Sequence, residues 1–369
     1  MSKSQQASLL DPPTAERLDK ELRQKSQASH EWLWQMMQDT VPRLLQPVEG
    51  PEAIVFLDNP LEGKEMQVLT RLANGFVVYL PPLALLVDPG PDVITRALAS
   101  GVELQRLNSI FISHPHLDHY AGAEAAIEEM CFLMLLRRGY LLLSEDAAHS
   151  TVISAFHRGA APYGGPEQVI VLHPGEPVEL LGARLTPVPA YHHGGGCGLI
   201  IEKNGLRLGY TSDTSYIVSY RASDGTLRTI EDNFAVMEDF AAIEEYRHDL
   251  KAAYSDVDVL VANVGGHASG ARLEMSALAL AHLLRGSQVQ LCLATHFLRT
   301  CLYPHDLRAD IARYVQAASG VPTLVAESRL RLELAPFRRG GNQGIGDQGI
   351  SRLGNQGISN QGIRTHAEA

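Results

Sequence analysis

The sequence is short of the features that mark secreted and membrane proteins. It has four cysteines among 369 residues, and they are widely scattered, at Cys131, Cys197, Cys292 and Cys301. That spacing argues against a disulfide framework and against a zinc-ribbon site. No apolar run approaches the roughly 20 residues that cross a bilayer, and the first residues lack the apolar core of a signal peptide. We therefore expect a cytoplasmic protein with no membrane partner.

Basic residues are also in short supply. The chain has 31 Lys and Arg against 42 Asp and Glu, which gives a formal net charge of -11. Because a long polyanion is held mainly by basic side chains, this balance does not favour long nucleic acid as a partner. A small-molecule or nucleotide-like substrate and assembly into a homo-oligomer are both compatible with it.

Composition divides the chain into three zones. Residues 1–46 predict an N-terminal helical extension, since apolar residues recur at helical spacing between Leu18 and Leu44. We expect it to pack on the core or on a second subunit rather than to recognise a ligand. Residues 337–369 repeat the motif NQGI and predict a low-complexity disordered tail. Residues 47–336 remain for one folded domain.

Strand-like and helix-like segments alternate within this domain. Runs such as GFVVYL, LNSIFIS, VDVLVANV and VQLCLATHF are apolar or β-branched, as buried strands are. Another strand is expected at EMQVLTRL, residues 65–72. Strands in hairpin-like order followed by strands separated by helices predict an α/β architecture with mixed sheets. Helices are expected over residues 122–130, 145–158, 237–254 and 275–285.

The most informative stretch is SIFISHPHLDHYAG, residues 109–122. It places His114, His116, Asp118 and His119 within six positions, directly after a run that reads as a buried strand. In an extended loop, residues two apart point the same way, so His114 and His116 can share one metal while the other two turn toward a second. Each residue alone could be a solvated side chain or a helix cap. The four together indicate metal binding.

A two-metal site needs more ligands, because zinc normally takes four or five. Three later strand ends offer them. His192 and His193 follow PVPAY, Asp213 follows LGYTS, and His296 follows LCLAT. Asp213 alone could be a turn former before Thr214, but its coincidence with the histidines points to a shared centre.

In this order the motifs resemble those of the metallo-β-lactamase superfamily. The similar segments are LLVDPGP at 85–91, HPHLDH at 114–119, YHHGGGCG, YTSDT and ATHF, and they span about residues 65–298. The resemblance implies an αββα sandwich, in which two mixed β-sheets pack face to face with helices outside. Residues 47–336 would then form a metallo-β-lactamase-like hydrolase domain.

The resemblance also implies a ligand set for two divalent ions. His192 is preferred over His193, because Gly198 then stands six residues after the ligand, as in ribonuclease Z-like members. Zn²⁺ best suits a set rich in histidine and free of cysteine, and Mn²⁺ or Fe would accept the same ligands. One ion would be held by His114, His116 and His192, and the second by Asp118, His119 and His296, with Asp213 bridging.

Two such ions would lower the pKa of a shared water, so the predicted reaction is hydrolysis by a metal-bound hydroxide. Asp118 would orient that water as well as bind metal. Asp88 would fix a ligand imidazole, or would only form a turn before Pro89. His267, after the run DVLVANVGG, would protonate the leaving group, as a histidine of this region does in the phosphodiesterase branch, or would be a loop histidine with no role.

The predicted substrate is a phosphodiester, small or nucleotide-like. Ribonuclease Z-like enzymes grip transfer RNA with a long arm, for which there is no room near APYGGP. The segment ANVGG is instead similar to the branch that includes lactonases, so a lactonase or other acyl or ester hydrolase is the alternative. An iron-dependent oxidoreductase and a non-catalytic binding module are the alternatives of another class.

The segment 215–254 is longer than the family usually places after the bridging aspartate. It is predicted to contain a turn at Asp224 and Gly225 and then an acidic amphipathic helix. It would be a lid over the site, or a packing or dimer element.

Overall fold

The computed structural model describes residues 12–57, 75–230, 239–268, 274–298, 301–302 and 304–339. The chain divides into two compact units, Met1–Pro47 and Val48–Ala369. Within the described part of the chain, no helix is both long and apolar enough to cross a membrane. The strand expected at residues 65–72 lies outside the described residues, as does nearly all of the expected tail.

The first unit consists of one long helix, α1 (Pro12–Leu44). Its length agrees with the helical spacing of apolar residues in the sequence. Trp32 and Trp34 are both about two-thirds exposed, at 67% and 65%. The prediction that this extension packs on the core or on a second subunit therefore stays a prediction.

Two mixed sheets of seven strands each form the second unit. Their strand orders are β17-β1-β2-β3-β4-β5-β6 and β16-β15-β14-β10-β9-β8-β7. In each sheet an antiparallel part is followed by parallel strands. The first sheet contains β1 (Ala53–Phe56), β2 (Phe76–Leu80), β3 (Leu83–Val87), β4 (Ser109–Ile112), β5 (Tyr140–Ser144), β6 (Gln168–Leu172) and β17 (Arg331–Glu333). The second contains β7 (Val178–Leu180), β8 (Ala183–Pro189), β9 (Cys197–Lys203), β10 (Leu206–Tyr210), β14 (Val259–Asn263), β15 (Leu291–Thr295) and β16 (Thr323–Val325).

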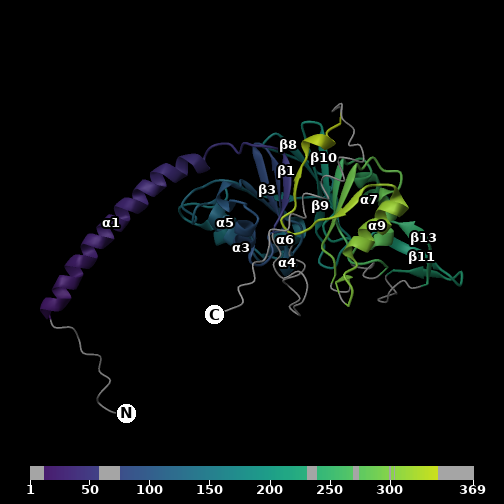
Figure 1. The fold of residues 1–369 in the computed structure, drawn as a ribbon, viewed down its shortest axis with the longest axis horizontal. Coiled ribbons are helices and arrows are strands. Elements are labelled where there is room, and N and C mark those ends of the chain that lie inside the picture. Colours follow the sequence, from purple (N-terminus) through teal and green to yellow (C-terminus); the bar gives the residue numbers. More distant parts are fainter. Residues whose placement is uncertain are drawn as a thin grey trace, which may run out of the picture. The chain divides into compact units, whose positions relative to one another are not determined.

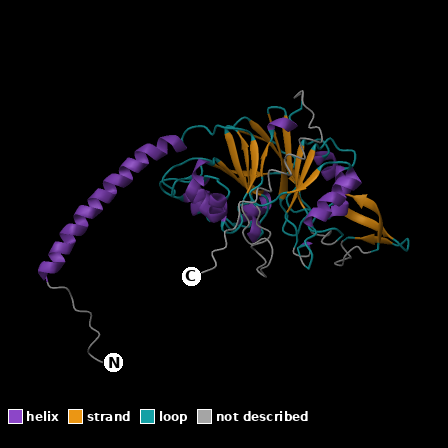
Figure 2. Ribbon diagram, viewed as in Figure 1, coloured by secondary structure: helices purple, strands orange, loops and turns teal. Residues whose placement is uncertain are grey.

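The sheets face each other and helices cover their outer sides (Figures 1 and 2). Strand β14 shows why: Val259 and Val261 pack in the core between the sheets, while Leu260 and Ala262 pack in the core under the helices. Alternate residues of a strand point to opposite faces, so an apolar run buries both sides. The predicted αββα sandwich is confirmed. The helices are α3 (Val93–Ala99), α4 (Leu117–Tyr120), α5 (Ala123–Met130), α6 (Glu145–His149), α7 (His248–Tyr254), α8 (Ala277–Leu284) and α9 (Arg308–Ser319).

Helix α6 is shorter than the helix expected over 145–158. It ends at His149, Thr151 then adopts a left-handed backbone with φ of 51°, and a separate helical turn follows at Phe156–Ala160. A β-branched residue in that conformation cannot continue a helix. The single helix predicted there was wrong.

The segment after Asp213 forms a third sheet, made of β11 (Ile217–Ala222), β12 (Leu227–Thr229) and β13 (Phe240–Tyr246). The helix expected over 237–254 was wrong for its first half, where β13 stands, and α7 forms only the second half. Phe240, Ile243 and Tyr246 are spaced like a helix stripe, but β13 pairs with β11 through several register shifts. At each bulge one extra residue shifts the side chains that follow to the other face of the strand. Apolar residues on one face can therefore recur every third position without a helix.

Candidate metal centre

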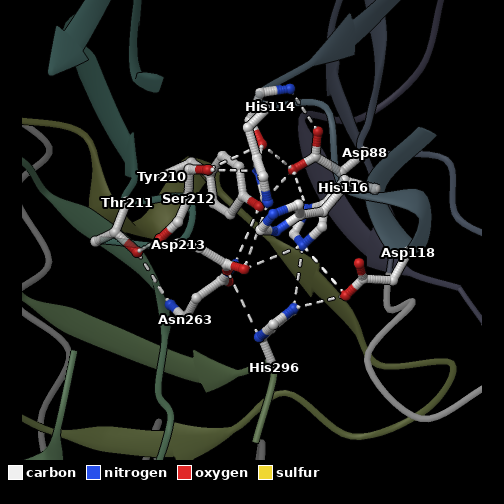
Figure 3. A network of polar contacts seen from close by, with 12 residues as sticks. Asp88, His114, His116, Asp118, Tyr210, Thr211, Ser212, Asp213, Asn263 and His296 are labelled. Carbon is white, nitrogen blue, oxygen red and sulfur yellow. Dashed lines mark hydrogen bonds and ion pairs between the residues drawn. The ribbon is translucent and has the colours of Figure 1, made fainter. Parts of the chain in front are cut away.

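The histidines and aspartates of the predicted ligand set come together at one edge of the two sheets, after strands or in helix α4. Figure 3 shows five of them close together: His114, His116, Asp118, Asp213 and His296. The first sheet supplies His114 and His116 after β4 and the residues of α4. The second sheet supplies His192 after β8, Asp213 after β10 and His296 after β15. Because carboxyl ends of neighbouring parallel strands meet at one sheet edge, residues far apart in sequence become neighbours there.

One group of candidate ligands consists of His114, His116, His192 and Asp213, whose possible metal-binding atoms all lie within 4.8 Å of one another. His192 Nε2 is 3.0 Å from His116 Nδ1. Asp213 Oδ2 is 3.6 Å from His114 Nε2 and 3.8 Å from His192 Nε2. Three ring nitrogens and one carboxylate oxygen therefore face a common point.

A second group consists of Asp118, His119 and His296, again within 4.8 Å. The Nε2 atoms of His119 and His296 are 3.1 Å apart, and Asp118 Oδ2 is 3.3 Å from His296 Nε2. Two imidazole rings facing each other at this distance repel each other when both are charged. Such a contact is typical of ligands that share one cation.

Asp213 lies between the two groups. Its Oδ2 atom is also 3.3 Å from His119 Nε2, a member of the second group. Its Oδ1 atom accepts a hydrogen bond of 2.6 Å from the Asn263 amide at the end of β14. Asn263 therefore fixes the carboxylate with Oδ2 turned toward both groups, which is the orientation that a bridging ligand needs.

Asp88, at the end of β3, organises the first sheet's half of the site. Its carboxylate accepts hydrogen bonds from the backbone and hydroxyl of Ser113, from the Tyr210 hydroxyl and from His119 Nδ1, the last at 2.9 Å. Since His119 donates from Nδ1 to Asp88, its Nε2 is the nitrogen available to a metal. The contacts match the role predicted for Asp88 of fixing an imidazole.

Burial and mutual charge set the protonation of these groups. Burial lowers the pKa of His114 well below its usual range. For His119, burial also lowers the pKa, but Asp213 and Asp88 outweigh it and hold the pKa well above its ordinary value. His296 behaves likewise beside Asp213 and Asp118, with its pKa raised to about 9. Burial raises the pKa of Asp213, but His296 and His119 outweigh it and hold the pKa well below its usual range.

Several backbones at the site are strained. Asp88, Ser212 and His296 have φ values of 48°, 54° and 58°, in the left-handed region that non-glycine residues rarely adopt. Such conformations persist only where the surroundings hold them, and they cluster at functional sites. Here they turn the chain sharply at three strand ends.

The residues fit a pair of divalent cations. His114 Nε2 is buried and has no hydrogen-bond partner, although it faces Asp213. An unpaired buried nitrogen costs free energy unless another group binds it, and a cation bound by Nε2 satisfies it. Histidine and carboxylate donors suit zinc, manganese and iron alike, so the geometry supports a metal site and leaves the choice among these metals to experiment.

The two other histidines named from the sequence lie apart from these groups. His193 is exposed next to His192. His267 is exposed as well, and its ring packs edge-on against Tyr314 of α9, with 5.0 Å between ring centroids. Its role as a leaving-group acid stays a prediction.

Sequence reasoning missed Glu274, which forms a further group with Asp213 and His296. Its side chain is buried, and its Oε2 atom has no hydrogen-bond partner. Burial and the charge of Asp213 raise its pKa well above the usual range. The only signal in the sequence is an isolated acidic residue just before the apolar start of α8, which is equally typical of a helix cap region.

The structure combines an αββα sandwich of two mixed sheets with two groups of histidine and aspartate side chains at one sheet edge. These features are those of a class of metal-binding αββα proteins. Residues 84–224 match the family described as beta-lactamase superfamily domain. The uncharacterized protein MJ1374 of Methanocaldococcus jannaschii is 33% identical over 156 residues, which are 40% of this chain and 56% of that protein. The chain thus matches little more than half the length of this relative.

Solved structures share the fold. The metallo-beta-lactamase fold protein YhfI of Bacillus subtilis superposes with a TM-score of 0.56 at 14% identity, covering 77% of this chain and 99% of that one. A diphosphatase of the PhnP family superposes with a TM-score of 0.50 at 16% identity, covering 76% and 97%. These superpositions show that the chain has the metallo-β-lactamase fold.

Proposed function

We propose that this protein is a dinuclear metal-dependent hydrolase and that its substrate is a phosphodiester, small or nucleotide-like. The observation that carries the proposal is the position of Asp213, whose Oδ2 faces His114 and His192 on one side and His119 on the other. A carboxylate so placed suits two cations rather than one. Sites of two cations are widely used for hydrolysis.

Bound cations would make a water molecule acidic near neutral pH and would stabilise negative charge on the substrate. The protein's own residues supply orientation. Asp118 has one oxygen directed at His296 and can hold a water with the other. Asp88 and Asn263 fix His119 and Asp213, so the ligands are in place before substrate arrives.

Charge supports an anionic substrate. Asp118 and Asp213 contribute two negative charges against four positive ones from two divalent ions, so the loaded centre attracts an anion. A phosphodiester meets that requirement, and the fold is shared with a diphosphatase. The acidic balance of the chain, 31 basic against 42 acidic residues, favours a small diester over a long nucleic acid.

A lactone or another ester is the second candidate. The observation that favours it is the position of His267 against Tyr314. A phosphodiester with a poor leaving group needs a proton donor, whereas hydroxide attacks the carbonyl of a lactone or ester much more readily, so hydrolysis there depends less on such a donor.

The test uses the purified 369-residue chain after metal analysis, with zinc, manganese or iron loaded separately. Substrates are bis-p-nitrophenyl phosphate, a simple lactone and a cephalosporin. We expect the diester to be hydrolysed with the highest kcat/KM, and Asp118→Ala to reduce it by about a hundredfold or more. Faster lactone turnover would transfer the assignment to the second candidate. A protein that binds metal but hydrolyses none of the three would contradict the hydrolase.

A further inference from the structure

The two ring nitrogens of His296 differ in their polar contacts. Its Nε2 faces Asp118 and His119 at 3.3 and 3.1 Å. Its Nδ1 is buried with no hydrogen-bond partner. Asp213 Oδ1 is 3.6 Å away, beyond hydrogen-bonding distance, and it already accepts from Asn263. If Nε2 binds a cation, Nδ1 carries the ring's proton and needs an acceptor.

Glu274 has a buried carboxyl oxygen that lacks a hydrogen-bond donor. Its side chain is 7% exposed, and Oε2 is buried without a partner. Its ligand atom lies within 4.8 Å of those of Asp213 and His296. Two unsatisfied buried groups, one requiring an acceptor and one offering it, therefore belong to side chains whose ligand atoms lie within 4.8 Å of each other.

The backbone around Glu274 is built to bring it there. Gly265 N donates to Met275 O at 3.0 Å, and Ala277 N donates to Gly266 O at 2.7 Å, which ties the start of α8 to the end of β14. A Cβ at Gly265 would stand 2.5 Å from Glu274 Cβ. Only glycine at 265 leaves room for the Glu274 side chain.

We propose that Glu274 is a positioning residue that accepts a hydrogen bond from His296 Nδ1 and thereby holds Nε2 toward the second metal group. Asp88 and His119 already show this arrangement at 2.9 Å. The two sheets would then be alike in this respect. The Nε2 atoms of His119 and His296 are 3.1 Å apart, and the Nδ1 atom of each ring would donate to a carboxyl group. The inference rests on the proposed metal site and not on any substrate. A carboxyl oxygen accepts whether or not the group is ionised, so no protonation state is assumed.

Three variants separate this role from others. Glu274→Gln keeps an acceptor oxygen at the same reach, Glu274→Met keeps the length without it, and Glu176→Gln removes an exposed carboxylate elsewhere as a control. Zinc affinity is measured for each stepwise site by chelator competition, and the Co²⁺ form by its absorption spectrum. We expect Glu274→Met to weaken one of the two sites by about 10- to 100-fold, with Glu274→Gln retaining most of the affinity and Glu176→Gln all of it.

A double-mutant cycle with His296→Ala shows whether Glu274 acts through that ring. The loss caused by Glu274→Met should disappear in the His296→Ala background, while a merely structural loss would remain. Equal losses in the Gln and Met variants would make Glu274 a direct ligand and would overturn the proposal, as would unchanged affinity in Glu274→Met. A parent chain that binds no metal would contradict the proposed function itself, so the two failures are distinguishable.

Discussion

At the scale of single residues, the centre distinguishes sharply between adjacent histidines. His192 Nε2 is 3.0 Å from His116 Nδ1, whereas His193 is exposed. We expect His192→Ala to lose most of one metal equivalent, because a ligand is removed, and His193→Ala to keep both. Metal content after dialysis measures the difference. The reverse pattern, or equal and negligible losses, would refute the assignment of His192.

The raised pKa of His296, about 9, gives the metal-free protein a specific pH dependence. A histidine in the unfolded chain titrates near 6.5, so between these values the folded state holds a proton that the unfolded state has lost. This stabilisation is complete below pH 6.5 and is lost as pH rises to about 9. We expect the free energy of unfolding of chelator-treated protein to fall across this window in urea titrations. With metal bound, the cations replace the protons and the fall should be absent.

Most of the ligand residues could be predicted because they stand shortly after an apolar strand, which sets the point and the direction in which the chain leaves the sheet. His114 after SIFIS and His296 after LCLAT are examples. Glu274 could not be predicted in this way. Its approach depends on the absence of a side chain at Gly265 and on hydrogen bonds between β14 and the start of α8, which only the folded chain supplies.

At the scale of elements, the turn between β8 and β9 packs closely against His114, a member of the first group of candidate ligands. Gly196 has φ of +114°, and a Cβ there would meet both His114 Cβ and Ser113 O at 2.6 Å. Gly50 has a similar φ of +122° with nothing within 4 Å, so it is a matched control. We expect Gly50→Ala to cost about 1 kcal/mol from backbone strain alone. Gly196→Ala should cost more and weaken zinc binding as well.

Urea unfolding and zinc titration of the two alanine variants measure these effects. Equal losses of stability with unchanged zinc affinity would show that the turn can move away from His114 without cost.

Large buried side chains anchor the sheet of β11, β12 and β13. Tyr220 is fully buried, while Leu227 is 58% exposed. We expect Tyr220→Ala to destabilise the protein by about 3 kcal/mol through the cavity it leaves, and Leu227→Ala to have little effect. Thermal unfolding provides the comparison. Near-equal stability of the two variants would favour a mobile lid.

The order of elements was readable from the sequence, but β13 was not. A strand interrupted by bulges shows apolar residues every third position, and that spacing is also the mark of a helix. Phe240, Ile243 and Tyr246 fit both patterns equally. The partner strand β11 decides between them, and nothing in the local sequence reveals it.

At the scale of the whole molecule, the division after Pro47 predicts independent units. A chain beginning at Val48 should fold, keep two metal equivalents and unfold at the same urea concentration as the full chain. The reason is that every predicted ligand and both sheets belong to the second unit. Metal analysis and urea titration of the shortened chain test this. Loss of metal would show that α1 supports the centre.

Four of the seven predicted ligands come from the segment after β4 and three from the second sheet. His119 and His296 lie 177 positions apart in the chain. During synthesis the first half therefore leaves the ribosome long before the second. A cation captured early would be held only by the ligands of the first sheet, and its coordination could be completed only once β15 has been made and docked. Metal loading should thus be among the last steps of this protein's biogenesis.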